Sequence, residues 1–285
     1  MRKDVIEDEI RRLPCWQGAP ALAPLSGGLS NLSFVADDAG ARYVVRCGGD
    51  IPVHHVFRER ERAAAIAAFE AGLSPQVVHA GPGFLVLRFI EARTYGEEDV
   101  RANIPRVAAL LHSVHRDVAP RLRGPANAFW VFHVIRDYSR LIGDASHVAI
   151  ANRLERLQMP LPVVFAHHDM LPANLLDDGS RLWLIDWEYG GFGTAMFDLA
   201  NTASNASFGP AEDEALLAAY FGQVTDAHRR SFDAMKAAST LREALWALVS
   251  DVHLKKPDID YQSHAREYLS RTDAALRLVD ERYGR

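Results

Sequence analysis

One segment near the middle of the chain constrains its fold more than any other. A His-x-Asp triplet ends at Asp169, Asn174 follows five residues later, and Asp186 closes an apolar run over residues 182–185. A second apolar run, over residues 162–165, leads into the triplet. Short apolar runs bounded by polar and turn-forming residues indicate strands. Two such strands flanking a loop would bring the three polar side chains together at one end of a small hairpin.

The chemistry of these three residues is that of a hard-cation site beside a base. Carboxylate and amide oxygens suit Mg²⁺, which also takes phosphate oxygens. Transfer of a γ-phosphoryl group requires such ligands and a carboxylate that orients and deprotonates a hydroxyl. Asp169 is therefore the candidate base, and Asn174 and Asp186 are the candidate Mg²⁺ ligands. Zinc held by the two histidines before Asp169 is an alternative, but no second group of histidines has a familiar ligand spacing.

Composition indicates the class of protein. The chain has 285 residues, 48% hydrophobic and 24% charged, which is ordinary for a globular protein of one large domain or two lobes. A net charge of -5 lends no support to a nucleic-acid or membrane-surface role. No apolar run approaches the ~18 residues of a membrane span. Two cysteines suit a reducing compartment, and the acidic N-terminus does not resemble a signal peptide, so we expect a cytoplasmic protein.

The pattern of predicted elements changes near residue 90. Strand patterns dominate before this point, whereas helical spacing of apolar residues dominates after it. We therefore expect a small N-terminal lobe over residues 1–90 and a larger C-terminal lobe over residues 91–285. The predicted strands are 32–35, 43–46 and 84–90, and the predicted helices include 1–16, 57–71 ending near Gly72, 107–114, 210–222 and 241–252.

Two further motifs carry a resemblance to a known family. The sequence Ile-Asp-Trp-Glu-Tyr at 185–189, with Phe-Asp-Leu-Ala-Asn at 197–201, resembles the choline and ethanolamine kinases, especially their bacterial branch. These enzymes are protein-kinase-like small-molecule phosphotransferases, and the similarity extends from about Leu25 to Tyr261. It implies an α+β, bilobal protein-kinase-like fold, with a small N-terminal antiparallel sheet plus helix and a larger, mainly helical C-terminal lobe. It also implies ATP and Mg²⁺ as cofactors, with ATP between the lobes.

The resemblance implies transfer of the γ-phosphoryl group of ATP to the hydroxyl of a small amino alcohol such as choline or ethanolamine. Alternatives within the same class are an aminoglycoside, a thiamine-like alcohol or a sugar as the acceptor. A non-catalytic nucleotide-binding protein that regulates a partner is a further alternative, although the intact Asp169, Asn174 and Asp186 argue against it. Only a short stretch separates Asp186 from Asp198, without the long activation segment of protein kinases, which indicates a small-molecule acceptor.

The N-terminal lobe carries the nucleotide contacts that the resemblance implies. A loop at residues 25–31 is similar to the family's Gly-Gly-x-Thr-Asn loop, and its backbone N–H groups would approach the phosphates, although an ordinary turn would also explain it. Arg46 ends a strand where protein kinases place a phosphate-binding Lys. Glu61 would pair with Arg46, and Glu59 is the rival. The candidate nucleotide-binding residues are Gly27, Gly28, Ser30, Asn31, Arg46 and Glu61, with Phe89 and Ile90 offering hinge backbone to the adenine.

The C-terminal lobe carries the implied catalytic loop. His167 is grouped with Asp169 in this loop, and we expect it to support the loop by hydrogen-bonding backbone rather than to react. Asp198 would anchor the same loop from below. His112 and His115 lie on an apolar helix and are expected to be structural.

A pocket for a cationic alcohol should combine aromatic faces with carboxylates, because cation–π attraction acts on ammonium groups. Glu188, Tyr189, Trp246 and Tyr261 match the family's pocket residues. Core packing on an amphipathic helix is the alternative for Trp246. Glu243 stands where eukaryotic relatives tend to have a second Trp, which thins the aromatic box and favours a primary amine or another cation. The sequence does not predict the oligomeric state.

Overall fold

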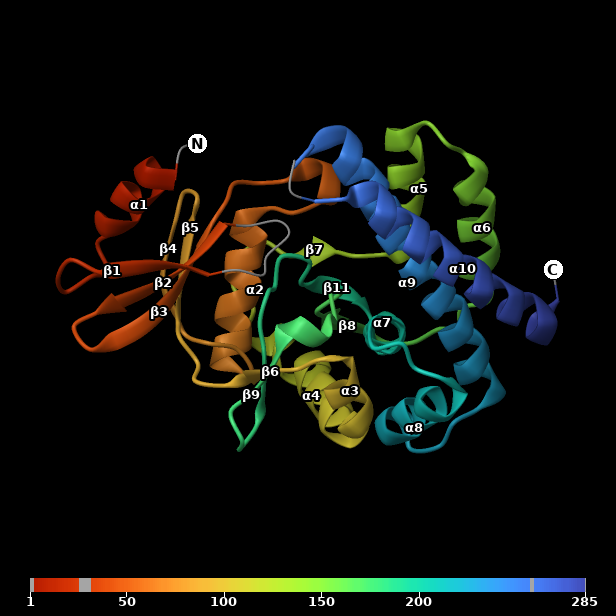
Figure 1. The fold of residues 1–285 in the computed structure, drawn as a ribbon. Coiled ribbons are helices and arrows are strands. Elements are labelled where there is room, and N and C mark those ends of the chain that lie inside the picture. The colour runs from red at the N-terminus through yellow and green to blue at the C-terminus, as the bar shows by residue number, and fades with distance from the viewer. Residues whose placement is uncertain (1–2, 26–31, 257–258, 285) are drawn as a thin grey trace.

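The molecule consists of a sheet-based part and a mainly helical part, which lie side by side (Figure 1). The computed structural model describes residues 3–25, 32–256 and 259–284. The predicted phosphate loop, with Gly27, Gly28, Ser30 and Asn31, therefore lies outside the described residues. Among the described helices, none combines the length and apolar character that a membrane span requires. The α+β class is confirmed, whereas the lobe boundary at residue 90 and the cytoplasmic location stay predictions.

A five-stranded antiparallel sheet forms the smaller part, in the order β1-β2-β3-β5-β4. Phe34, Val45 and Val86 point to a core that Ile6 and Ile10 of helix α1 complete. The hairpin between β2 and β3 turns through Ala39 and Gly40, which both have positive φ, as a type I′ turn requires. The elements are α1 (Lys3–Arg11), β1 (Ala21–Leu25), β2 (Leu32–Asp38), β3 (Ala41–Cys47), β4 (Val77–Gly81) and β5 (Phe84–Arg88).

Helix α2 (Arg58–Glu70) lies between this sheet and the helical part (Figure 1). Its buried alanines join the core of the larger part, so small side chains let the helix approach closely. The chain leaves the helix through Gly72, whose φ of +76° suits glycine, as predicted. The helix therefore connects the two parts through its packing.

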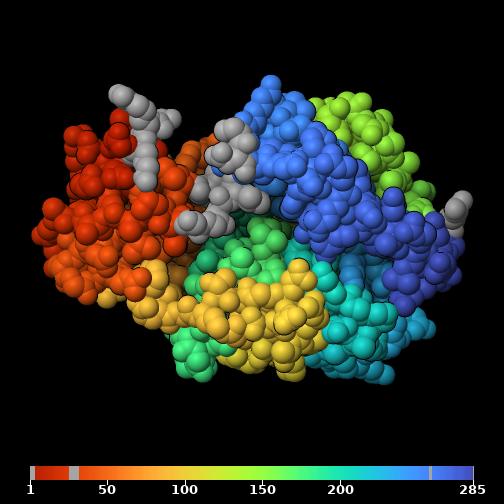
Figure 2. Space-filling model, viewed as in Figure 1, coloured from red at the N-terminus to blue at the C-terminus, as the bar shows by residue number. Residues whose placement is uncertain are grey.

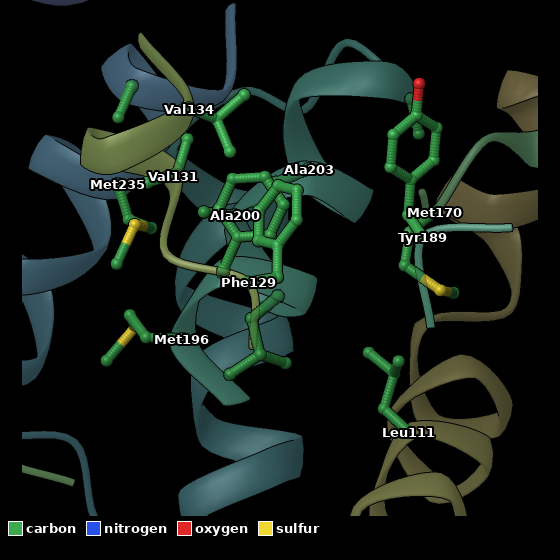
Figure 3. Close-up of a cluster of buried hydrophobic side chains, with 14 of the residues drawn as sticks. Leu111, Phe129, Val131, Val134, Met170, Tyr189, Met196, Ala200, Ala203 and Met235 are labelled. Atoms are coloured by element: carbon green, nitrogen blue, oxygen red, sulfur yellow. The ribbon is translucent and has the colours of Figure 1, made fainter. Parts of the chain in front are cut away.

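The larger part is built from helices around a continuous apolar core. Figure 3 shows Phe129 between Met196 and Met235 on one side and Leu111, Met170 and Tyr189 on the other, all of them members of this core. The predicted helix from Pro210 to Gly222 is confirmed. The helices are α3 (Glu97–Ala102), α4 (Ile104–Asp117), α5 (Val131–Ile142), α6 (Ser146–Glu155), α7 (Ala195–Asn205), α8 (Pro210–Phe221), α9 (Asp226–His253) and α10 (Tyr261–Tyr283).

Two small sheets carry the motif, and they correct the predicted hairpin. Strand β8 (Val163–Ala166) pairs with β11 (Gly191–Thr194), and β11 also pairs with β7 (Asn127–Ala128). Strand β10 (Leu182–Leu184) instead pairs with β9 (Leu175–Asp177), which also pairs with β6 (Arg93–Thr94). The predicted pairing of 162–165 with 182–185 is wrong, because a turn at Pro172–Asn174 starts a new strand that meets β10 first.

Candidate active site

A hollow lies where the small sheet, helices α9 and α10, and the α3–α4 region meet (Figure 2). The segment that carries the motif forms its floor, drawn in green. A cavity of about 360 Å³ lies between the small sheet and the segment that carries the motif. Residues from both sides line it, including Val44, Arg46, Phe89, Ile90, Asn174 and Asp186.

The predicted hinge residues lie at this cavity. Phe89 and Ile90 both line it, beside the aliphatic side chains of Val44 and Leu87. The backbone N–H of Phe89 donates to the carbonyl oxygen of Arg42 at 3.0 Å, and the Arg42 guanidinium lies 3.9 Å from the centre of the Phe89 ring. The apolar walls suit a planar base, and Phe89 is held in place by its contact with β3.

Arg46 joins the small sheet to the motif. Its guanidinium lies 2.8 Å from Glu61 of α2 and 2.6 Å from Asp186, and only 12% of its side chain is exposed. Glu61 is buried, whereas Glu59 is exposed, so the structure selects Glu61 as the partner. Burial lowers the pKa of Arg46, but the neighbouring carboxylates outweigh burial and raise it, so this cation is permanent. A permanent cation at the cavity suits phosphate oxygens.

Glu188 lies in the same charged cluster. Its carboxylate is 3.1 Å from Arg58 and 3.5 Å from Arg46, and Arg58 also contacts Glu61 at 2.6 Å. Burial and the nearby Asp186 raise the pKa of Glu188, while Arg46 opposes them. The structure therefore places Glu188 against two arginines, beside Arg46, and its assignment to the acceptor pocket stays a prediction.

Asp198 of α7 holds the catalytic loop through its backbone. Its two carboxylate oxygens accept the N–H groups of His167 and His168, each at 2.8 Å, and His115 Nε2 lies 3.0 Å away. One turn further along α7, Asn201 accepts the N–H of Met170. Asp198 is fully buried, so these bonds satisfy a charge that water cannot reach. The geometry agrees with the predicted anchor.

His167 supports the loop from beneath. Its Nδ1 accepts the N–H of Asp169 at 3.3 Å, so Nε2 carries the proton and donates to the carbonyl oxygen of Ile185 at 2.9 Å. Burial lowers the pKa of His167, which favours this neutral form. Both ring nitrogens are thus engaged with backbone, which fits a supporting role and leaves the chemistry to Asp169.

The two candidate metal ligands lie together despite the changed strand pairing. The N–H of Ile185 donates to the carbonyl oxygen of Asn174 at 3.0 Å, which joins the two segments. The amide nitrogen of Asn174 donates to the carbonyl oxygen of Asp169, so its Oδ1 is left for another partner. Asp186 has a φ of +67° and lines the same cavity. One amide and one carboxylate oxygen fit Mg²⁺, which completes its shell with phosphate oxygens and water.

The two histidines before Asp169 are the residues on which a zinc site would depend. Within residues 3–25, 32–256 and 259–284, no group of three or more His, Cys, Asp or Glu side chains is arranged to hold a metal ion. His168, the second histidine of the motif, stacks on Phe129 at 4.3 Å and contacts the Tyr189 carbonyl through Nδ1. Its ring lies in the core beneath the loop.

A second arginine, Arg242, lies beside Asp169, on the side away from Arg46. Arg242 of α9 places Nη1 3.9 Å from the Asp169 carboxylate and 2.7 Å from Glu243. Its guanidinium also lies 4.6 Å from the centre of the Tyr189 ring. Burial raises the pKa of Asp169 well above its usual range, and Arg242 is the largest opposing influence. The sequence analysis missed Arg242, although a charged residue beside the apolar stripe of α9 was a visible signal.

The predicted aromatic residues Trp246 and Tyr261 lie together near Arg242 and Glu243. The rings of Trp246 and Tyr261 lie 6.0 Å apart at 68°, and the Trp246 ring is 6.2 Å from His264. His264 in turn contacts Glu243 at 3.0 Å. Trp246 is only 8% exposed and belongs to the apolar core, and its role in an acceptor pocket stays a prediction.

The segment between β3 and α2 supports Trp246 from behind. His54 stacks beside Trp246 at 5.4 Å, and its two ring nitrogens contact the Tyr138 hydroxyl at 3.0 Å and the Ser250 hydroxyl at 2.9 Å. Burial lowers the pKa of His54 to about 3, so the ring is neutral. A segment from the nucleotide side thus packs directly on α5 and α9.

The arrangement can orient a hydroxyl next to Asp169, between a phosphate-binding side at Arg46 and an acceptor side at Trp246 and Tyr261. The sequence of the whole chain is similar to known proteins. The phosphotransferase enzyme family model named APH matches residues 21–234. Protein LicA of Haemophilus influenzae is 25% identical over 275 residues, covering 90% of this chain and 79% of that protein.

Solved structures agree with the sequence comparison. A choline/ethanolamine kinase family protein from Mesorhizobium loti superposes with a TM-score of 0.79 at 28% identity, covering 97% of this chain and 95% of that one. Choline kinase LicA from Streptococcus pneumoniae has a TM-score of 0.76 at 23% identity, covering 96% and 98%. The second similarity is evidence for the fold alone. The fold that the resemblance implied is therefore confirmed.

Proposed function

This chain belongs to the phosphotransferase enzyme family, and we propose that it transfers the γ-phosphoryl group of ATP to the hydroxyl of a small amino alcohol such as ethanolamine or choline. One observation carries the proposal: the floor of the interlobe cavity brings Asn174 and Asp186 next to Arg46, with Asp169 hydrogen-bonded to Asn174 through its carbonyl oxygen. A base, two hard-cation ligands and a permanent phosphate-side cation are the parts that phosphoryl transfer needs. A non-catalytic regulator has no use for this combination.

Each residue of the site has a separate role that follows from its position. Asp169 accepts the proton of the acceptor hydroxyl and aims its oxygen at the γ-phosphorus. Arg46, held by Glu61, binds phosphate oxygens, and the apolar wall with Phe89 and Ile90 binds the adenine. Asn174 and Asp186 would hold Mg²⁺, which neutralises phosphate charge when bound. Positioning and charge neutralisation dominate this chemistry, so the loop anchored at Asp198 determines the rate.

Two features support a small amino alcohol as the acceptor. Strand β11 is the one element between Asp186 and α7 in this described stretch, so the stretch is too short to bind a protein substrate as a long activation segment does. The similar solved structures include a choline/ethanolamine kinase family protein and a choline kinase. Trp246, Tyr261 and the Glu243 carboxylate, which is partly exposed, supply the aromatic faces and the negative charge that a small ammonium group requires.

A coupled ADP-release screen tests the proposal. Ethanolamine, choline, thiamine, an aminoglycoside and a sugar are each offered with MgATP, and phosphorylated product is identified by mass. We expect an amino alcohol to raise ADP release far above the rate with water alone, and Asp169→Asn to abolish the increase. If thiamine, an aminoglycoside or the sugar is phosphorylated and neither amino alcohol is, the proposed acceptor class is wrong and the phosphorylated compound identifies the correct one. If neither the wild type nor Asp169→Asn forms a phosphorylated product from any of these acceptors, the proposal that the chain phosphorylates a small alcohol is refuted.

A further inference from the structure

Arg242 is the most deeply buried charged group at the acceptor side. Only 2% of its surface is exposed, and it stands on α9 next to the fully buried Leu241 and Leu245. In the described part of the chain, its Nε and Nη2 are buried and have no hydrogen-bond partner. Folding a guanidinium into such a place is costly, because donors removed from water remain unsatisfied. A cost of this kind calls for a compensating role.

The remaining nitrogen indicates that role. Nη1 is directed to Glu243 at 2.7 Å and to the Asp169 carboxylate at 3.9 Å. Glu243 is held from its other oxygen by His264 of α10 at 3.0 Å. A continuous series of charged contacts therefore runs from His264 through Glu243 and Arg242 to Asp169. The side chains in it come from α10, α9 and the catalytic loop.

The Arg242 guanidinium also covers Tyr189. Its central carbon lies 4.6 Å from the ring centre, within the range of a cation–π contact. The ring of Tyr189 is itself buried in the core beneath the loop. The face of Tyr189 that the resemblance offered to a substrate cation is thus taken by the chain's own cation. Arg242 is consequently held by the Glu243 carboxylate and by the Tyr189 ring. A cation fixed in this way can hold the neighbouring Asp169 carboxylate in position.

We propose that Arg242 is a positioning residue for phosphoryl transfer, whose guanidinium holds the Asp169 carboxylate in its place at the acceptor side. The inference rests on the proposed role of Asp169 as the base. Glu243 and His264 hold Arg242 in turn, so Glu243 acts on the reaction through Arg242 in addition to facing the acceptor. Arg46 and Arg242 then bracket the reacting centre, with Arg46 on the phosphate side and Arg242 on the acceptor side.

A double-variant cycle tests this role. Arg242→Met removes the charge and keeps an extended apolar side chain, Arg242→Lys keeps a charge, and each is combined with Asp169→Asn. Arg229→Met is the matched control, because Arg229 is on the same helix, is half-buried, and pairs with Glu214 and Asp226 rather than with residues of the site. The readouts are kcat, the KM for MgATP, MgATP binding by calorimetry and the melting temperature, with ethanolamine as acceptor and also with water alone.

We expect Arg242→Met to lower kcat about 100-fold, the size typical of a misplaced catalytic group, while MgATP binding changes less than twofold. Arg242→Lys should recover part of the loss, and Arg229→Met should match the wild type. In the Asp169→Asn background, where transfer to the amino alcohol is already abolished, Arg242→Met should leave the remaining rate of ATP hydrolysis by water unchanged, because Arg242 acts through Asp169. An equal loss in that background, a kcat within threefold of wild type, or a parallel loss of MgATP binding would overturn the proposal.

A second variant and a second reaction guard against an unfolded variant and a wrong acceptor. Should Arg242→Met fail to fold, Arg242→Lys carries the same cycle, and a loss of equal size in the presence and in the absence of the Asp169 carboxylate would overturn the proposal. ATP hydrolysis by water needs no amino alcohol. If no amino alcohol is phosphorylated, the acceptor class fails, whereas the effect of Arg242→Met on hydrolysis still decides the positioning role.

Discussion

Replacing Asp198 by Asn should disturb both stability and catalysis, because one carboxylate holds the whole catalytic loop. The carboxylate is fully buried and accepts the N–H groups of His167 and His168 while contacting His115. An Asn side chain offers one acceptor oxygen and turns an N–H group toward the other backbone donor. The variant therefore loses at least one charge-assisted hydrogen bond and leaves one buried N–H unsatisfied.

The magnitude follows from these contacts. A hydrogen bond to a charged group is worth about 1.5–3 kcal/mol, and an unsatisfied buried donor costs about 1–3 kcal/mol. Since the variant no longer buries a charge, part of the loss is offset, and we expect a net destabilisation of about 2–5 kcal/mol. For a chain of 285 residues, the entropy of unfolding converts this to a fall in Tm of about 3–8 °C. A loop displaced by about 1 Å should lose about 100-fold in kcat.

Thermal unfolding by circular dichroism and steady-state kinetics check this. Asp226→Asn is the matched control, because that carboxylate is fully exposed and pairs with the surface residue Arg229, so its replacement should leave the Tm close to that of the wild type. A Tm within 2 °C of wild type for Asp198→Asn would refute the energetic reasoning. A lower Tm with an unchanged kcat in the folded protein would refute the claim that Asp198 positions the loop.

The same residue predicts a pH dependence. Burial raises the pKa of Asp198, but the hydrogen bond from His115 and the nearby imidazoles outweigh it, so the net pKa lies below the usual range. A carboxyl group whose folded pKa lies below its unfolded value of about 3.9 stabilises the protein above that pH, and the contribution is lost as pH falls. The free-energy difference between wild type and Asp198→Asn should therefore be full near neutral pH and shrink below about pH 4. A difference that stays constant down to pH 3 would contradict this.

Three further substitutions test the assigned roles. Asp169→Asn should abolish turnover while MgATP still binds, because the base is lost and the phosphate side is intact; a rate above a small fraction of wild type would exclude Asp169 as the base. Asp186→Ala should remove Mg²⁺-dependent nucleotide binding, and unchanged affinity and stoichiometry in calorimetry would count against it. Trp246→Ala should raise the KM for an amino alcohol roughly 2- to 30-fold, the worth of a lost cation–π contact, with little change for ATP. A fall in stability alone would assign Trp246 to the core.

Features set by neighbours in the sequence were predictable. The turn between β2 and β3, the end of α2 at Gly72 and the limits of α8 at Pro210 and Gly222 all depend on residues a few positions apart. Strand β1 was missed, since it contains Pro24 and carries little alternation, and an edge strand tolerates both. Strand β4 was missed as well, although it lies at the other edge of the same sheet.

Choices between similar residues needed the packed structure. Glu59 and Glu61 are equally charged and two positions apart, but they point in different directions from α2, and only Glu61 is turned toward β3. Glu188 was assigned to the acceptor pocket by its place after Asp186, and its contact with Arg58, 130 positions earlier, was not predicted. Nothing in the local pattern encodes such an encounter.

The sequence alone determined the chemistry of the site, because base, amide and carboxylate must occur as residue types in a fixed order for the motif to exist at all. It also determined the class of fold, since the change from strand to helical periodicity is a local property. Only the tertiary structure decided that residues 163–166 pair with 191–194, that Glu61 holds Arg46, and that Arg242 faces Asp169. The physical reason is that strand pairing and buried ion pairs depend on which distant segments meet when the core closes, and that is a property of the whole packed chain.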